Sequence, residues 1–282
     1  MPIQFLNTNG RGGFTLKNNS GAGRFSMSVS GTATDTDAQA FFDRVTAAGG
    51  SLSLTEQNAV NQLVLDLKAN SLWNSMTAIY PMVGASAAAC AQNLKSSSYT
   101  GSFSGGWTYT NTGVLPNGTN AYMDTGLNSS TVLSLNNLHF SVYLRTNTDG
   151  LKVDLGVYNN SLSTGINIFT RFSNILYLRL NDDDLSTIST TDSRGFKLGT
   201  RNNSTTKNIF NNNVKTSVTS NSISLVNLNV YLAAFNNTVG GINYYSDRQN
   251  AFASLGLGLS DTDAANFYTN VQTFQTSLSR QV

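Results

Sequence analysis

The sequence predicts a mainly β protein whose strands form a sandwich or jelly roll, and three observations support this. From about residue 94 onward, short runs of alternating apolar and polar residues recur, separated by Asn, Gly and Ser at spacings of roughly 8–12 residues. Hydrophobic residues make up 39% of the 282 residues, which is enough to build a core. Charged residues make up only 11%, so uncharged polar side chains must supply most of the surface.

The first segment is predicted to be an N-terminal β arm. Two short alternating stretches are joined by a Gly- and Asn-rich turn whose residues tolerate positive φ. A lone hairpin is marginal in water, so this one needs a partner surface. We favour an arm that anchors the chain to another subunit or protein over a flexible tail. Its contact residues would be Phe14, Leu16, Phe25, Met27 and Val29.

Next comes a predicted helical segment. One helix, capped by Thr34 or Asp35, is expected to end at Gly49–Gly50. A second helix, beginning near Thr55, carries apolar residues at helical spacing as far as Met76. The segment would act as a neck or packing collar, and the sequence leaves open whether it packs on its own β domain or on a partner.

The β region contains two runs whose alternation assigns residues to faces. One run places Ile166, Ile168 and Phe172 on one side. In the next, Ile175, Tyr177 and Arg179 alternate with three leucines. A helix capped by Ser260 or Asp261 is predicted to close the chain. The predicted division is a β anchor arm over 1–34, a helical neck over 35–93, and a jelly roll with a C-terminal helix over 94–282.

Few residues could carry catalysis, because the chain has one His (His139), one Cys (Cys90) and one Glu (Glu56). A site of His and Cys ligands needs about four such residues for one metal ion. Glycosidases need a pair of carboxylates, and a Ser-His-Asp triad would have to use His139, which alternates away from the core face. We therefore expect no enzymatic activity, and a buried, inert thiol at Cys90.

Two sets of residues are candidates for binding. A glycan needs an aromatic face with nearby hydrogen-bonding groups, and aromatic residues in loop-rich regions are the candidates: Trp107, Tyr109, Tyr244 and Tyr245. The acidic triplet Asp182, Asp183 and Asp184 could hold Ca²⁺, although its spacing matches no calcium loop and a polar hairpin turn is the favoured interpretation. No other cofactor is expected.

Charge and hydropathy exclude two classes of partner. The net charge is +2 and the 17 Lys and Arg residues are scattered, which argues against nucleic-acid binding. No apolar run approaches the roughly 20 residues of a membrane span, so membrane insertion is not expected. The first residues lack the apolar stretch of a signal peptide, which predicts synthesis and folding in a cytoplasm.

Five stretches of the β region carry a resemblance to a known family: Phe103–Trp107, Leu115–Leu127, Leu138–Thr146, Phe252–Tyr268 and Val271–Val282. These stretches resemble virion proteins of tailed bacteriophages, especially phages of gut and aquatic Bacteroidetes. More broadly, the β region resembles a concanavalin A-like (laminin-G-like) jelly roll, and the likeness covers roughly four fifths of the chain when the helical segment is included.

The resemblance implies a non-enzymatic structural protein of a virion, made in the cytoplasm of the bacterial host. It would be a head fibre, head decoration or tail-associated protein, bound to capsid or tail proteins through the N-terminal arm. A homo-oligomer such as a trimer and adhesion to a host-surface glycan fit this role. Two alternatives stay open: a glycan-binding module and, less favoured, a polysaccharide-degrading glycosidase.

Overall fold

The computed structural model describes residues 14–18, 25–29 and 33–282, which belong to two compact units, residues 1–35 and 36–282. In the first unit, β1 (Phe14–Asn18) and β2 (Phe25–Val29) form an antiparallel hairpin with Phe14 opposite Val29. The predicted hairpin is therefore present. The side chains proposed as anchor contacts lie outside the described part of the structure, so the anchoring role stays a prediction.

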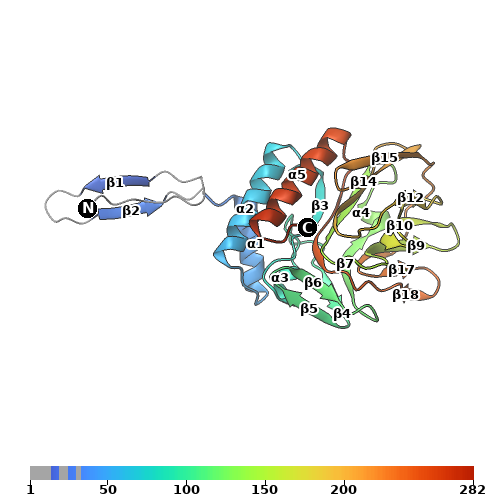
Figure 1. Ribbon diagram of the computed structural model, residues 1–282, viewed down its shortest axis with the longest axis horizontal. Coiled ribbons are helices and arrows are strands. Elements are labelled where there is room, and N and C mark those ends of the chain that lie inside the picture. The colour runs from blue at the N-terminus through green and yellow to red at the C-terminus, as the bar shows by residue number, and fades with distance from the viewer. Residues whose placement is uncertain (1–13, 19–24, 30–32) are drawn as a thin grey trace. The chain divides into compact units, whose positions relative to one another are not determined.

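The second unit is a sandwich of two sheets, as predicted (Figure 1). Among the described strands, all pairs are antiparallel except that of β17 with β9. The nine-stranded sheet contains, in order, β12 (Ser186–Ser189), β11 (Ile175–Asp182), β10 (Thr164–Phe172), β9 (Leu155–Asn159), β16 (Asn229–Leu232), β7 (Tyr122–Asn128) and β4 (Ser102–Ser104), with β17 (Phe235–Asn237) and β18 (Gly241–Asn243) joined through β9.

The eight-stranded sheet faces the first one across an apolar core. Residues of alternate positions meet there, such as Phe140 and Val142 from one sheet and Ile166 and Leu178 from the other, all without solvent exposure. The sheet contains, in order, β15 (Val214–Thr219), β14 (Thr206–Asn211), β13 (Gly195–Arg201), β8 (Leu138–Leu144), β19 (Asn250–Gly256), β6 (Gly113–Pro116) and β5 (Trp107–Thr110), with β3 (Met76–Tyr80) paired to β19.

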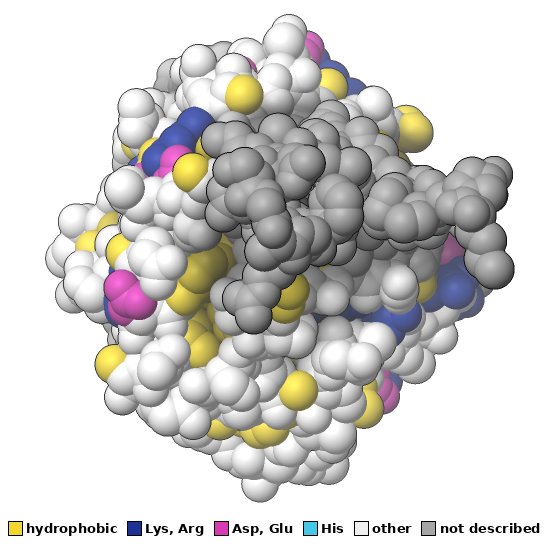
Figure 2. Space-filling view, turned by 90° about the vertical axis from the view of Figure 1, so that its left-hand side faces the viewer, with side chains coloured by type: hydrophobic (Ala, Val, Ile, Leu, Met, Phe, Trp, Pro, Cys, Tyr) yellow, Lys and Arg dark blue, Asp and Glu magenta, His cyan; other side chains and the backbone are white. Residues whose placement is uncertain are grey.

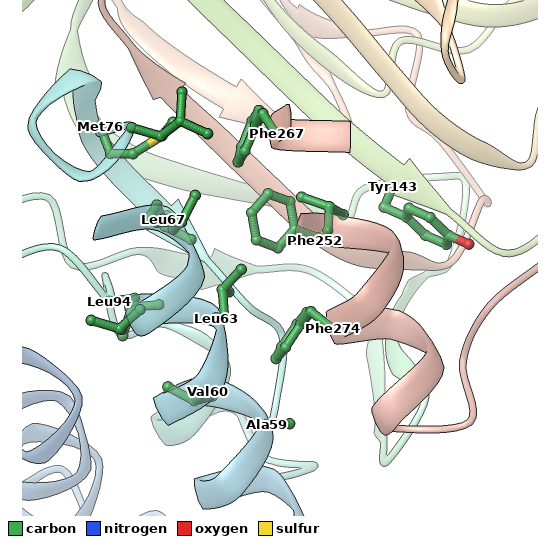
Figure 3. Close-up of a cluster of buried hydrophobic side chains, with 14 of the residues drawn as sticks. Ala59, Val60, Leu63, Leu67, Met76, Leu94, Tyr143, Phe252, Phe267 and Phe274 are labelled. Atoms are coloured by element: carbon green, nitrogen blue, oxygen red, sulfur yellow. The ribbon is translucent and has the colours of Figure 1, made fainter. Parts of the chain in front are cut away.

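Three helices cover the other face of the eight-stranded sheet: α1 (Thr36–Ala47), α2 (Leu54–Ala69) and α5 (Asp261–Ser277). A second core forms there, in which Leu63 and Leu67 of α2 and Phe267 and Phe274 of α5 meet Phe252 of β19 (Figure 3). Every residue of β8 is buried, because its two faces contribute to the two cores. The remaining short helices are η1 (Trp73–Ser75), α3 (Ala87–Cys90) and α4 (Ser129–Val132).

The two longer helices begin with reciprocal capping bonds. In α5, the predicted cap Ser260 accepts a bond from the Asp263 N–H, and the Asp263 carboxylate accepts one from the Ser260 N–H. Helix α2 has the same arrangement between Ser53 and Glu56. The predicted cap at Thr55 was therefore two residues late, because Ser53 has the acidic residue three positions on that completes the capping box.

The helical prediction as far as Met76 was wrong. Helix α2 ends at Ala69, and Ser71 has a left-handed φ of +59°, which interrupts the helix. Met76 then begins strand β3, which pairs with β19 through Tyr80 opposite Ala253. Because β3 adds a strand to the sheet and α2 packs against α5, the segment predicted as a neck shares one compact unit with the sandwich, without a division at residue 94.

Figure 2 shows the side of the molecule that carries the helices. Its described surface consists mainly of uncharged polar groups, with a few charged side chains and small groups of hydrophobic ones. None of the described helices is long and apolar enough to cross a membrane. The scarcity of charged side chains on this surface matches the low charge content of the sequence.

Candidate functional site

The outer face of the nine-stranded sheet carries a cluster of aromatic side chains, and among the described elements no helix covers it (Figure 1). Strand alternation explains the cluster: Ile166 and Ile168 of β10 point into the core, so Phe169 points outward. We call this cluster the aromatic face. It consists of Tyr158 of β9, Phe169 and Phe172 of β10, Tyr177 of β11, Phe235 of β17 and Tyr244 beyond β18.

The rings of the aromatic face contact one another across four strands. Phe169 is at the centre, with ring centroids 6.3 Å from Tyr177, 6.2 Å from Phe235 and 6.3 Å from Tyr244. Phe235 also stacks on Tyr158, with centroids 5.2 Å apart and an interplanar angle of 24°. These centroid distances lie within the range of favourable contacts between aromatic rings.

A shallow apolar hollow of about 150 Å³ lies at one end of the aromatic face. Phe169, Phe172 and Tyr177 line it together with Leu151 and Leu185. Phe169 is buried, whereas 44% of Leu151 is exposed, and Tyr244 nearby is 42% exposed. Exposed apolar side chains around a concave surface are typical of a binding site.

A glycine makes room for the aromatic face. A Cβ atom on Gly156 of β9 would lie 2.8 Å from Cδ2 of Phe235 and 2.6 Å from Cγ1 of Val153. The Phe235 ring therefore lies directly over the Gly156 backbone. Any larger residue at position 156 would displace this ring and the stack that it forms with Tyr158.

Two polar side chains adjoin the rings. Asn167 of β10 is fully buried, and neither its Oδ1 nor its Nδ2 has a hydrogen-bond partner among the described residues. Arg179 of β11 places its guanidinium carbon 4.7 Å from the ring centroid of Tyr158. In the sheet register, Asn167 is opposite Arg179 and Phe169 is opposite Tyr177. The aromatic face therefore borders a pair of hydrogen-bonding side chains.

The structure separates the four aromatic residues predicted to bind glycans. Tyr244 belongs to the aromatic face, and Tyr245 is half-buried and has no ring contact among the described residues. Trp107 and Tyr109 pack edge-on against Phe103, with centroids 5.0 and 5.2 Å away. The Trp107 indole N–H donates to the Ser104 carbonyl oxygen at 2.9 Å. This second cluster lies against the core between the sheets, away from the aromatic face.

The remaining aromatic-face residues were missed at the sequence level, although part of the signal was present. Alternation had already placed Tyr177 and Arg179 opposite to the core leucines of β11. Phe172 had been assigned to the side of Ile166, and that assignment was wrong. A register shift between Phe169 and Phe172 turns Phe172 outward, toward Tyr177 at 6.1 Å.

The acidic triplet forms internal ion pairs. Asp182 is fully buried, and its carboxylate lies 2.7 Å from Nη2 of Arg201 and 2.8 Å from Nζ of Lys207. Asp184 accepts a hydrogen bond from Ser186 and lies 3.3 Å from the same lysine, whereas Asp183 is exposed. Among the described residues, no group of three His, Cys, Asp or Glu side chains could hold a metal ion. The proposed calcium site is therefore unsupported by this arrangement.

The single histidine is part of a buried hydrogen-bond network. Nδ1 of His139 donates to the Leu257 carbonyl oxygen at 2.5 Å, so Nε2 must accept from the Ser254 hydroxyl at 3.1 Å. Ser141 in turn donates to the Ser254 oxygen at 2.7 Å. Burial lowers the pKa of His139 to about 4, and the ring packs edge-on against Phe267. This Ser–His pair has no access to a substrate.

Cys90 and Glu56 are also occupied within the fold. Burial raises the pKa of the Cys90 thiol to about 12, and its Sγ donates to the Val83 carbonyl oxygen. Glu56 caps α2 and accepts a bond from the Gly84 N–H at 2.7 Å. It is the only ionisable residue lining a polar hollow of about 540 Å³ between the start of α2 and the end of α5. A lone carboxylate there cannot act as a glycosidase pair.

Comparisons with known proteins identify no family. No family model matches the chain, and no curated protein matches it. Among solved structures, the chain is similar to domain 4 of AbnA, a GH43 extracellular arabinanase from Geobacillus stearothermophilus, in complex with arabinotriose. The identity is 12%, the TM-score is 0.46, and the match covers 68% of this chain and 98% of that domain.

The chain is also similar to two toxin binding domains. The botulinum neurotoxin serotype D binding domain is 11% identical, with a TM-score of 0.47, over 71% of this chain and 52% of that one. The binding domain of Paraclostridial Mosquitocidal Protein 1 is 12% identical, with a TM-score of 0.40, over 62% and 48%. This chain thus spans about half of each toxin domain. The sandwich fold is assigned from the sheet order of this chain itself.

The ion pairs of Asp182 lead to a prediction about stability, and Asp183 of the same acidic triplet provides the control. Asp182→Asn should lower the free energy of unfolding by about 3–5 kcal/mol, because it leaves Arg201 and Lys207 buried beside a neutral group. Asp183→Asn should change it by less than about 0.5 kcal/mol. Urea unfolding with and without millimolar Ca²⁺ measures both effects. A calcium-dependent rise in the midpoint that Asp183→Asn abolishes would contradict the ion-pair interpretation.

His139 predicts a pH dependence of stability. Its pKa is about 4 in the folded protein and about 6.5 when unfolded, so the unfolded chain binds more protons between these values. The contribution of His139 to the free energy of unfolding should be fully present above about pH 6.5. It should fall by about 3 kcal/mol as the pH drops toward 4. Unfolding free energies at pH 7.5 and 4.5 test this. The His139→Gln variant should show a shallower dependence, and an unchanged slope would refute the assignment.

Proposed function

We propose that this chain is a non-catalytic binding module that holds a glycan on its aromatic face. The observation that carries the proposal is the cluster of mutually packed rings on the uncovered face of the nine-stranded sheet, with an apolar hollow at one end. The central strands of the opposite sheet are buried between the helices and the nine-stranded sheet. The aromatic face, in contrast, is not covered by any described helix.

The chemistry of the aromatic face suits a sugar. A pyranose ring presents C–H groups on its faces and hydroxyl groups at its edge, so it needs aromatic rings below and hydrogen-bonding groups beside it. Tyr177 and Phe172 supply partly exposed rings, and Asn167 and Arg179 supply polar groups without a full set of partners. A few polar groups at an otherwise apolar concavity are typical of small-molecule sites.

The proposal of a non-catalytic role is supported by how the reactive side chains are used. His139 and Cys90 are buried, with the pKa of the histidine lowered and that of the thiol raised by burial. The buried aspartates Asp154 and Asp182 are each paired with an arginine. These contacts support a binding role for the module.

A second proposal, compatible with the first, is that the chain is a structural component of a tailed-phage virion. It is supported by the sequence resemblance and by the N-terminal hairpin of β1 and β2, which belongs to a compact unit of its own. In this role the hairpin would attach to a capsid or tail protein, and the sandwich would present the aromatic face to the host surface. A homo-oligomer such as a trimer would raise avidity for a repeated glycan.

The binding proposal is tested with the full chain on an array of bacterial surface glycans. At least one glycan should bind, and Tyr177→Ala should raise its Kd about tenfold, because a ring contact is removed without opening a core. Tyr268→Ala, which removes a half-buried tyrosine on the helix side, should leave the Kd unchanged. Absence of binding across the array, or equal losses in both variants, would contradict the proposal.

The virion proposal is tested by immunogold electron microscopy of purified particles of a phage that encodes this chain. An antibody against residues 36–282 should label the capsid or the tail. Deletion of residues 1–31 should abolish incorporation into particles while the sandwich still folds. An antibody that binds the folded protein but leaves intact particles unlabelled would refute a virion role.

A further inference from the structure

We infer that the glycan bound on the aromatic face carries a carboxylate, and that Arg179 pairs with it. This inference rests on the proposed glycan-binding function and specifies its ligand class, an oligosaccharide that contains hexuronic acid. The observation behind it is a half-buried arginine beside the aromatic rings that forms no ion pair within 4 Å among the described residues.

Sheet geometry places Arg179 next to the rings. Tyr177 and Arg179 are two residues apart on β11, so both point to the outer face about 7 Å from each other. Their partners on β10 are Phe169 and Asn167. The aromatic pair Phe169 and Tyr177 therefore lies beside the polar pair Asn167 and Arg179. One saccharide ring can lie on Tyr177 while a carboxylate of the same or the next ring reaches Arg179.

The hydrogen-bonding groups of Arg179 are poorly satisfied within the chain. Its Nε is buried without a partner, and its Nη2 donates only a long bond of 3.3 Å to the Asp183 backbone oxygen. The guanidinium lies over the Tyr158 ring, which holds the cation on the aromatic face. Other outer-face cations differ from Arg179, because Arg171 pairs with Asp149.

The neighbouring Asn167 strengthens the case for a polar ligand. Its amide is fully buried with both polar atoms unpartnered, and it lies opposite Arg179 in the register. Leaving such groups unpaired is costly, and a bound carboxylate or hydroxyl group would accept or donate the missing bonds. An arginine offers parallel N–H donors that match a carboxylate, which favours an acidic sugar over a neutral one.

Two aspartates are the charges that oppose such a ligand. Asp184 is engaged by Lys207 and Ser186, and it also interacts electrostatically with Arg179. Asp183 is exposed and has no compensating ion pair among the described residues. Substitutions at these two positions should therefore change the affinity in opposite directions. Arg179→Gln should weaken binding of an acidic glycan, and Asp183→Asn should strengthen it.

The test uses the full chain and oligogalacturonate, oligomannuronate and hyaluronan fragments, each with its carboxyl-reduced neutral counterpart. Isothermal titration should give a Kd at least about tenfold lower for an acidic oligosaccharide than for its reduced form. Arg179→Gln should remove this preference, and Asp183→Asn should increase it. Raising the salt concentration should weaken binding of the acidic form alone.

The outcomes separate this inference from the function on which it rests. In one outcome, acidic and reduced forms bind equally, Tyr177→Ala loses this binding and Arg179→Gln keeps it. That outcome would overturn the carboxylate pairing but would still support a glycan site on the aromatic face. Binding of neutral array glycans with none of the acidic panel would also overturn it. A preference for acidic forms that Arg179→Gln leaves intact would overturn the role of Arg179. Unchanged thermal midpoints of the variants exclude misfolding as the cause.

Discussion

The arrangement of this protein depends on one constraint: the central strands of the eight-stranded sheet, β13, β8 and β19, are buried on both faces. Phe140 and Val142 of β8 face the nine-stranded sheet, while Tyr143 faces the helices. The helices are held against the sheet by apolar burial, and the second sheet is held on the other side in the same way. No described helix covers the outer face of the nine-stranded sheet, and the aromatic side chains lie there.

Because of the same burial, polar residues in and beside the eight-stranded sheet must find hydrogen-bond or ion-pair partners within the protein. His139, Ser141 and Ser254 form a chain of hydrogen bonds between β8 and β19. Arg248 and Asp154 form a buried ion pair, and the arginine also bonds backbone oxygens, among them those of Thr148 and Arg171. The histidine, serine and aspartate side chains in these networks are of the kinds that take part in catalysis in enzymes. Here they form internal hydrogen bonds that hold loops in position.

Local patterns in the sequence predicted those features that depend on local physics. Most of the strand alternation, the position of α1 to within a few residues, and Ser260 as one of two possible caps of α5 were predicted, because they follow from periodicity and capping. Met76 was misassigned because Leu72, Trp73 and Met76 fit a helical stripe, whereas pairing with β19 decides in favour of a strand. Long-range pairing of this kind leaves no local signal.

Most of the aromatic face could not be assembled from the sequence for a related reason, although Tyr244 and the outward direction of Tyr177 were predicted. Its rings come from β9, β10, β11 and β17, and the contact of Phe169 with Phe235 joins residues far apart in the sequence. The bulge that turns Phe172 outward shifts the alternation by one step, which periodicity alone cannot detect. The pairing of Asp182 with Arg201 and Lys207 likewise depends on neighbouring strands, so the triplet seemed free to bind a cation.

The buried Arg280 has a consequence for how the protein is made. Burial lowers its pKa to about 9, and its guanidinium donates to the carbonyl oxygens of Met82, Pro81 and Ala251. Residues nearly 200 positions apart must therefore meet before the sandwich can close. During synthesis on the ribosome, the segment containing β3 must wait for β19 and Arg280 to emerge, with its strand edges unpaired. Such a delay favours chaperone binding during translation and makes the nascent chain more prone to aggregation than the finished protein.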